Sequence, residues 1–210
     1  MRLRVMVLCG AICLSGIATK AQMGAAAPAV EPGTPVEPAK TLDALLSLYE
    51  GEVVGVAKAM PADKYSFAPS AATFAAGSPA KFDTVRTFSQ EVTHIAEANY
   101  YFYSSFSGMK PDVDMAALDK MSKDPKASKE DALKMLTSSL AFAHKAIATI
   151  TTANAFVAIK PIDGQNTRAS LAAFGVAHGY DHYGQMVEYL RMNGIVPPGS
   201  EVKQTVVRKK

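Results

Sequence analysis

Four long stretches of the chain carry apolar residues at alternating steps of three and four, the spacing that places side chains on one face of an α-helix. They cover about residues 42–60, 82–106, 128–150 and 167–192. No other stretch alternates polar and apolar residues with a period of two over a useful length. Four amphipathic helical stretches with long connections between them predict an all-α protein, a four-helix bundle.

Local signals mark the ends of these predicted helices. Ser128 and Asp131 form a capping-box pattern before the third helix, with aspartate in place of the preferred glutamate, and Thr167 can cap the fourth. Residues 62–80 are expected to form a loop of turns, and residues 110–127 a polar connection. The expected stop signals are Pro61 after the first helix, Ser107-Gly108 after the second and Asn193-Gly194 after the fourth.

The apolar seams predict which side chains face the core. The first seam consists of Leu42, Leu45, Tyr49, Glu52, Val56 and Ala59, with Leu46, Val53 and Met60 beside it. The fourth consists of Ala173, Val176, Tyr180, Tyr183, Val187 and Leu190. His178 and His182 lie off the fourth seam on a neighbouring semi-polar face, and His94 lies with Glu97 on a similar face of the second helix. Two such faces are what a pocket on one side of a bundle would present.

The histidine pair is the strongest candidate for chemistry. His178 and His182 are four residues apart, so a helix brings both imidazoles to one face, close enough to share a divalent cation. Two ligands hold a metal weakly, and only His94 and His144 remain to supply a third. The residues alone leave two interpretations open, a metal site or histidines on an ordinary solvated or core-edge face.

The N-terminus has the features of an export signal. Arg2 and Arg4 precede an apolar run over residues 5–17, and small residues follow at the positions that a signal peptidase reads. We therefore expect residues 1–21 to be a signal peptide, a mature chain beginning near Gln22, and a periplasmic or secreted protein. The apolar run is shorter than the roughly 20 residues that a membrane-spanning helix needs, so no stable membrane insertion is expected.

The rest of the chain divides by composition. Residues 22–40 are rich in alanine and proline with almost no large apolar side chain, which predicts a flexible linker. Residues 41–200 are long enough for one domain with its own core. Residues 201–210 form a short basic C-terminal tail, which is more often solvated than bound to nucleic acid.

Removal of the signal changes what charge and cysteine content imply. It takes away three basic and no acidic residues, so the formal charge falls from +3 to about zero. Cys9 and Cys13, the two cysteines of the chain, leave with it, which excludes a disulfide, a thiolate metal ligand and a cysteine nucleophile in the mature protein. The near-zero charge and the lack of a basic face argue against a nucleic-acid partner.

Four short motifs follow one another along the chain. They are Met60 to Pro69 (MPADKYSFAP), Val92 to Asn99 (VTHIAEAN), His178 to Gln185 (HGYDHYGQ) and Met192 to Pro198 (MNGIVPP). In this combination the chain resembles the DinB family of metal-binding four-helix bundles, over essentially all of residues 41–200. The last motif is similar to the ending of secreted bacterial members.

The resemblance implies one divalent ion, most often zinc or nickel, bound by three histidines. The matching positions are His94, His178 and His182, and His144 matches none. The sequence departs from the family pattern at Ala68, where an arginine often precedes the proline, and at Gly179, where an acidic residue is common.

The same resemblance suggests a metal-dependent hydrolase of an unknown small molecule, because the family's thiol-transfer activities use cytoplasmic thiols and fit poorly with export. Glu97 and Asp181 are candidate general bases, since each lies one turn from a histidine on its own helix. Their alternative role is to orient an imidazole N–H or to be solvated. The alternative function is a non-catalytic protein of the cell envelope that binds metal or a small ligand. A homodimer is left open.

Overall fold

The computed structural model describes residues 30–74 and 76–200, and the chain divides into two compact units between Pro35 and Val36. The described part of the first unit is a turn closed by the Thr34 N–H, which donates to the carbonyl oxygen of Glu31 (3.1 Å). All helices and strands of the described residues belong to the second unit. The predicted signal peptide (1–21), residues 22–29 of the predicted linker and the basic tail (201–210) lie outside the described residues.

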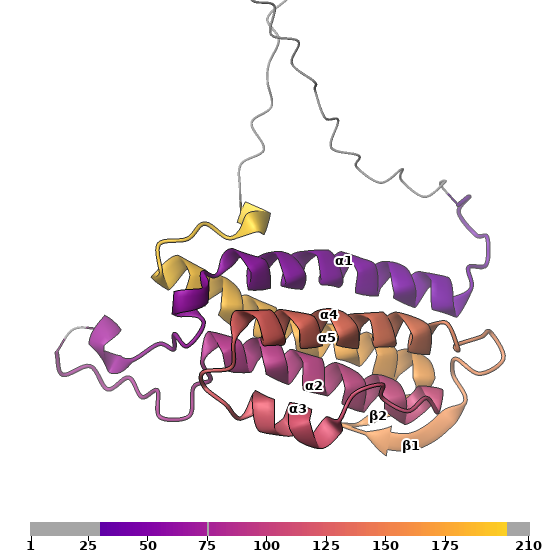
Figure 1. Ribbon diagram of the computed structural model, residues 1–210. Helices are drawn as coiled ribbons and strands as arrows, with labels where there is room; N and C mark the ends of the chain where they lie inside the picture. Colours follow the sequence, from indigo (N-terminus) through magenta and orange to yellow (C-terminus); the bar gives the residue numbers. More distant parts are fainter. Residues whose placement is uncertain (1–29, 75, 201–210) are drawn as a thin grey trace, which may run out of the picture. The chain divides into compact units, whose positions relative to one another are not determined.

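The second unit is an all-α bundle, as predicted (Figure 1). Its four long helices are α1 (Pro38–Ala59), α2 (Phe88–Ser107), α4 (Lys129–Ile147) and α5 (Arg168–Met192). The predicted caps are present: the side chains of Ser128 and Thr167 accept hydrogen bonds from the backbone N–H of Asp131 and Ser170. Gly108 ends α2 with a φ of 73°, the left-handed conformation that glycine adopts without strain.

The structure corrects three details of the predicted elements. The second helix begins at Phe88 rather than near Phe82, because Thr87 and Gln90 form a reciprocal capping box that fixes its start. The segment predicted as a polar connection contains a short helix, α3 (Met115–Ser122), capped by Asp114. The segment before α5 contains an antiparallel hairpin of β1 (Ala158–Ile162) and β2 (Gln165–Thr167).

Three short 3₁₀ turns complete the description. They are η1 (Ala62–Lys64), η2 (Ala71–Thr73) and η3 (Pro198–Ser200). The first two lie in the region predicted as a loop of turns, in agreement with the sequence. Among the residues that the structure describes, no helix combines the length and apolar character needed to cross a membrane.

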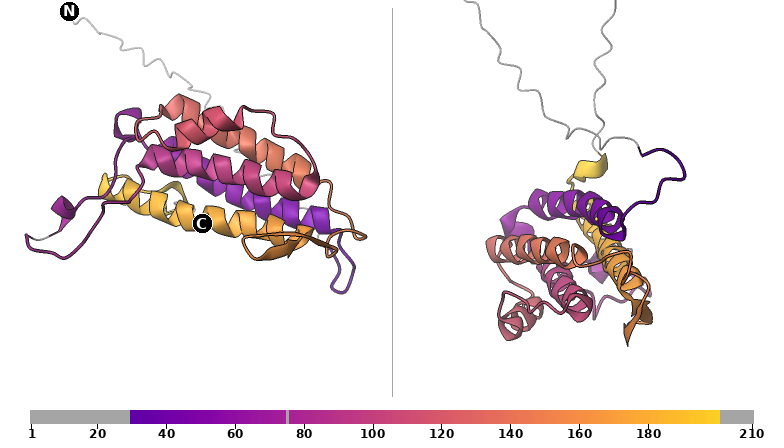
Figure 2. Two further views of the ribbon diagram at one scale, coloured as in Figure 1. Left: turned by 90° about the horizontal axis from the view of Figure 1, so that it is seen from below. Right: turned by 90° about the vertical axis from the view of Figure 1, so that its right-hand side faces the viewer.

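The four long helices surround one core, with α2 and α1 each packed against both α4 and α5 (Figure 2, right). α2 and α4 run in the same direction, and α1 and α5 run in the opposite one (Figure 1). Because α2 and α4 are parallel, the segment that connects the end of α2 to the start of α4 must run back along the length of the bundle. α3 belongs to this segment and lies outside the four long helices (Figures 1 and 2). The antiparallel neighbours α2 and α5 carry the three histidines of interest.

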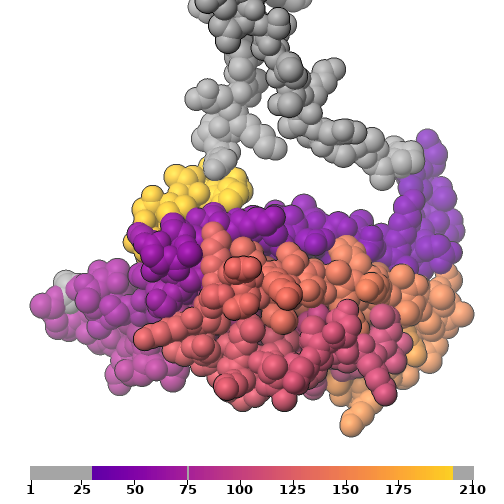
Figure 3. Space-filling model, viewed as in Figure 1, coloured from indigo at the N-terminus to yellow at the C-terminus, as the bar shows by residue number. Residues whose placement is uncertain are grey.

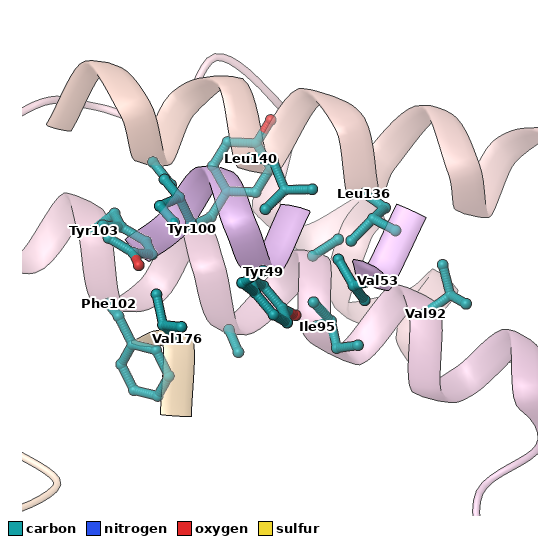
Figure 4. Packing of buried hydrophobic residues seen from close by; sticks show 14 of the residues in the cluster. Tyr49, Val53, Val92, Ile95, Tyr100, Phe102, Tyr103, Leu136, Leu140 and Val176 are labelled. Carbon is teal, nitrogen blue, oxygen red and sulfur yellow. The ribbon is translucent and has the colours of Figure 1, made fainter. Parts of the chain in front are cut away.

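Side chains from all four helices fill the core (Figure 4). Tyr49 and Val53 of α1, Ile95 of α2 and Leu136 of α4 are at most 1% exposed. A hydrogen bond from the Asn99 amide to the Ser139 hydroxyl (3.1 Å) joins α2 to α4 within this apolar surrounding. The side chains of α1, α3 and α4 cover one face of the core (Figure 3).

The buried rows of α1 and α5 are rotated from the predicted seams. In α1 the row runs through Leu46, Tyr49, Val53, Val56 and Met60, and Leu45 is exposed. In α5 it runs through Leu171, Ala172, Gly175, Val176, Gly179, His182, Met186, Tyr189 and Leu190. Of the predicted α5 seam, Val176 and Leu190 are buried, whereas Tyr180, Tyr183 and Val187 are only partly buried, because Gly175 and Gly179 take core positions that the apolar pattern does not reveal. His182 therefore lies in the buried row, not beside it.

Candidate metal centre

Two glycines let other helices approach α5 where it carries the histidine pair. A Cβ added at Gly179 would lie 2.2 Å from the hydroxyl oxygen of Tyr49, and one added at Gly175 would lie 2.9 Å from that of Tyr103. The Tyr103 hydroxyl also donates to the backbone carbonyl of Ala172 (3.1 Å), which fixes α2 against α5. Because glycine has no Cβ, the two tyrosines can pack closely against α5 around the histidine pair.

The three histidines that the sequence singles out come together between α2 and α5. One ring nitrogen from each of His94, His178 and His182 can be chosen so that all three lie within 4.8 Å of one another. His178 and His182 are the closest pair, with 3.3 Å between their Nε2 atoms. The ring of His94 lies 4.7 Å from that of His182 and 5.3 Å from that of His178, centroid to centroid.

A buried carboxylate orients the innermost histidine. Glu91 of α2 is 1% exposed, and its Oε2 lies 2.6 Å from Nδ1 of His182. If the Nδ1–H donates to this carboxylate, the Nε2 lone pair of His182 is directed at the other two histidines. Sequence reasoning missed Glu91. The signal was its position between Phe88 and Ile95 on the core face of α2, where an acidic residue is buried only with a partner.

Burial keeps two of the imidazoles neutral. It is the main cause that lowers the pKa of His94 to about 3, and Arg86 and the other two histidines add to the effect. Burial also lowers the pKa of His178, with a smaller contribution from His182. A neutral imidazole keeps the lone pair that a metal ion requires.

The donor set fits a divalent cation on two grounds. Two nitrogens at zinc bond lengths of about 2.0–2.1 Å and tetrahedral angles stand roughly 3.3 Å apart, the separation already present between His178 and His182. A cation among three neutral imidazoles would also balance the negative charge of the ionised Glu91, which is buried and costly to leave uncompensated. His94, His178 and His182 would hold the ion.

A pocket of about 360 Å³ opens beside the cluster. It is lined by His94, Glu97, Ala98, Tyr101, Phe102, Met115, Asp163 and His178. Asp163 belongs to the two-residue turn of the hairpin, where Asp163 and Gly164 both have positive φ (44° and 77°). The β-hairpin and the start of α3, both unpredicted, therefore complete the walls of this pocket. His182 lies deeper and does not line it.

The two candidate general bases have different positions. Glu97 lines the pocket, with its Oε2 3.9 Å from Nδ1 of His94. Asp181 is exposed, accepts a hydrogen bond from the Gln185 amide (3.3 Å) and is not among the lining residues.

His144 lies away from the cluster, between α4 and α1. Its Nδ1 is 2.5 Å from Oδ1 of Asp43, and its Nε2 is 2.9 Å from Oε2 of Glu50. Burial acts to lower the pKa of His144, but the hydrogen bonds with the two carboxylates outweigh it and raise the pKa overall. With both ring nitrogens engaged by α1, His144 joins two helices and takes no part in the three-histidine group.

The fold and the cluster agree with the comparison against known families. The profile of the DinB superfamily matches residues 48–186, which is well over half of the chain. No curated protein matches the sequence. The chain belongs to the DinB superfamily, and its three-histidine cluster fits metal binding.

Proposed function

We propose that this member of the DinB superfamily binds one divalent metal ion through His94, His178 and His182 and uses it to hydrolyse a small molecule held in the adjoining pocket. The observation that carries the proposal is the convergence of three imidazoles from two helices, with Glu91 holding the buried one in place. Zinc is the first choice because imidazole suits it and no thiolate is available, with nickel next; copper or iron would fit the same nitrogens.

In such a reaction the metal ion and the side chains of the pocket would have different roles. When bound, a divalent ion supplies a Lewis acid that polarises a carbonyl or makes a water more acidic. Glu97 faces the pocket beside His94, so it is placed to accept a proton from an attacking water. Phe102 and Tyr101 supply apolar surface that orients a substrate and excludes water. We favour Glu97 over Asp181 because Asp181 does not line the pocket.

Metal titration of the full chain tests the site. We expect one equivalent of zinc or nickel to bind, and single changes to alanine at His94, His178 or His182 to weaken binding by at least tenfold. His144→Gln is the matched control and should leave the stoichiometry unchanged. Parent-like binding by all three alanine variants, or loss of metal from folded His144→Gln, would show that the ligands are assigned wrongly.

A substrate screen on the metal-loaded protein separates hydrolysis from the alternative, non-catalytic binding of a metal or small ligand in the cell envelope. If the chain is a hydrolase, Glu97→Gln should lower kcat by about 10²-fold or more while metal still binds. Turnover that survives this change would remove Glu97 from the mechanism, and a screen without turnover favours the binding role.

We also propose that the protein is exported, because two arginines precede an apolar run at its N-terminus. N-terminal sequencing of periplasmic material should then find a cysteine-free chain that begins near Gln22. Folded cytoplasmic protein that retains Met1 would contradict the proposal.

A further inference from the structure

The pocket beside the histidines is acidic. Glu97 and Asp163 supply its carboxylates, and no lysine or arginine is among its lining residues. Neither carboxylate forms an ion pair with a lysine or arginine anywhere in the part of the chain that the structure describes. Within these residues neither charge is taken up by a close ion pair with a lysine or arginine, although Asp119 and, to a smaller extent, Glu97 raise the pKa of Lys123, which does not line the pocket.

In the described part of the chain, Arg86 is the cation that acts on the histidines, and it lies outside the pocket. Arg86 lowers the pKa of both His94 and His178, so its field reaches the cluster, but it precedes α2 and does not line the pocket. Glu97 is eleven residues further along the chain, and most of this separation runs along α2, so the two are roughly 15 Å apart in that direction. The pocket extends along α2 away from Arg86, towards Tyr101.

Aromatic and thioether surface completes the pocket. Tyr101 is 51% exposed, whereas Phe102 is buried and packs against the His178 ring in a T-shaped arrangement, with 5.3 Å between the ring centroids. Met115 contributes from the first residue of α3. Aromatic faces beside carboxylates are the surroundings in which proteins bind organic cations, because both attract positive charge.

A bound divalent ion would not reverse this preference. The charge of a divalent ion is opposed by Glu91 directly behind His182, and the three ligands themselves are neutral when they coordinate it. Glu91, Glu97 and Asp163 together carry three negative charges against the two positive charges of such an ion, so the balance at the site and its pocket stays negative.

We propose that the pocket selects small organic cations, molecules with an aromatic or apolar body and a protonated or quaternary amine. The amine would lie between Glu97 and Asp163, and the body against Tyr101, Phe102 and Met115. This inference rests on the proposed function in one respect, since it takes the pocket to be the substrate side of that metal site.

Benzyltrimethylammonium is the probe of choice, because it has no lone pair and cannot act as a metal ligand. Benzyl alcohol and benzoate are its neutral and anionic counterparts. Ligand-observed NMR on the full chain, with and without zinc, should show binding in the order ammonium, alcohol, benzoate in the zinc-free protein. Equal or tighter binding of benzyl alcohol or benzoate in that sample would overturn the inference.

The matched variants test the carboxylates. Glu97→Gln combined with Asp163→Asn should weaken benzyltrimethylammonium binding about tenfold. The control, Glu130→Gln with Asp63→Asn, makes the same change in net charge at two exposed positions outside the pocket, and should change binding less than twofold. Equal effects of the two double variants would mean that net charge, not the pocket, attracts the probe, and would overturn the inference.

Zinc titration of the same samples keeps the two proposals apart. Tight zinc binding without cation selectivity would leave the metal site standing and overturn the inference. Cation selectivity without zinc binding would support the pocket's charge preference and contradict the proposed metal function. Circular dichroism of each variant confirms that helix content is unchanged before any comparison is made.

Discussion

At the scale of single residues, the candidate site depends on side chains that would not contact a bound ion. Glu91 is buried, and its Oε2 lies 2.6 Å from Nδ1 of His182. This contact determines that Nε2 of His182 faces the other two histidines. A partner of this kind raises the basicity of the ligand and restricts the rotation of its ring.

We therefore expect Glu91→Gln to lower metal affinity about 10–100-fold without removing a ligand. Glutamine retains an oxygen that accepts from Nδ1–H of His182, so the change removes mainly the negative charge. Competition with a chelator measures the affinity, and Glu130→Gln on the exposed face of α4 serves as the control. Affinity unchanged from the parent would show that the Glu91 carboxylate contributes only to folding.

Gly179 is a second residue of this kind, because it provides the space that Tyr49 fills. A Cβ there would meet Tyr49 atoms at 2.2–2.8 Å, far inside van der Waals contact. We expect Gly179→Ala to destabilise the protein by about 1–3 kcal/mol, although alanine favours helix. Gly184→Ala in the same helix has nothing within 4 Å and should stabilise by up to about 1 kcal/mol. Urea denaturation measures both, and stabilisation by both changes would contradict the packing argument.

At the scale of helices and strands, His144 links α4 to α1 in a way that depends on pH. Its folded-state pKa is raised above the ordinary value near 6.5 by Asp43 and Glu50, which outweigh burial. A raised pKa means that the stabilisation is fully present below pH 6.5 and is lost as pH rises through the folded-state pKa. The effect is modest, because the carboxylates are 49% and 37% exposed and the pair is screened by solvent.

The prediction is that metal-free parent protein exceeds His144→Gln in stability by about 0.5–1 kcal/mol at pH 5.5, and by less at pH 8.5. Urea denaturation at both pH values gives this difference. The pKa of His94 is lowered by burial, so its contribution to stability has the opposite pH dependence. This contribution is the same in the parent and in the variant, and it cancels in the difference between them. A difference that grows with pH would show that the contact with α1 does not favour the protonated ring.

The elements that could be predicted from the sequence are those with strong local signals. Ser128, Thr167 and Gly108 fix helix ends through bonds between near neighbours, so their patterns are visible without the fold. α3 has only eight residues, too few for a clear apolar period. The hairpin has a three-residue second strand and a proline in its first, although its Asp163-Gly164 turn is a recognisable hairpin signal.

The candidate site was predictable in part for the same reason. The spacing of His178 and His182 is a local signal, and the resemblance supplied His94 as the third histidine. The burial of His182 and the role of Glu91 depend on how α5 is rotated against α2. That rotation is set by contacts at Gly175 and Gly179 with tyrosines from other helices, which no single stretch of sequence reveals.

At the scale of the whole molecule, most of the apolar core lies away from the histidine cluster, although His182 and Glu91 are among the buried side chains of α5 and α2. The apolar rows of the four long helices pack against one another, and the cluster occupies one side between α2 and α5. We therefore expect the bundle to fold without metal, in contrast to small domains that need a metal to fold. A bound metal would then stabilise the folded state by mass action.

This gives a quantitative expectation for thermal unfolding. Zinc at a free concentration one hundred times its Kd should add about 2.7 kcal/mol, which for a domain of this size raises Tm by roughly 5–10 °C. Metal-free protein should still unfold cooperatively with full helix content, as judged by circular dichroism. His94→Ala should lose the zinc-dependent rise, and His144→Gln should keep it because both of its ring nitrogens face α1. A metal-free chain without a cooperative transition would mean that the ion is part of the core's folding, and an equal rise in His94→Ala would place the ion elsewhere.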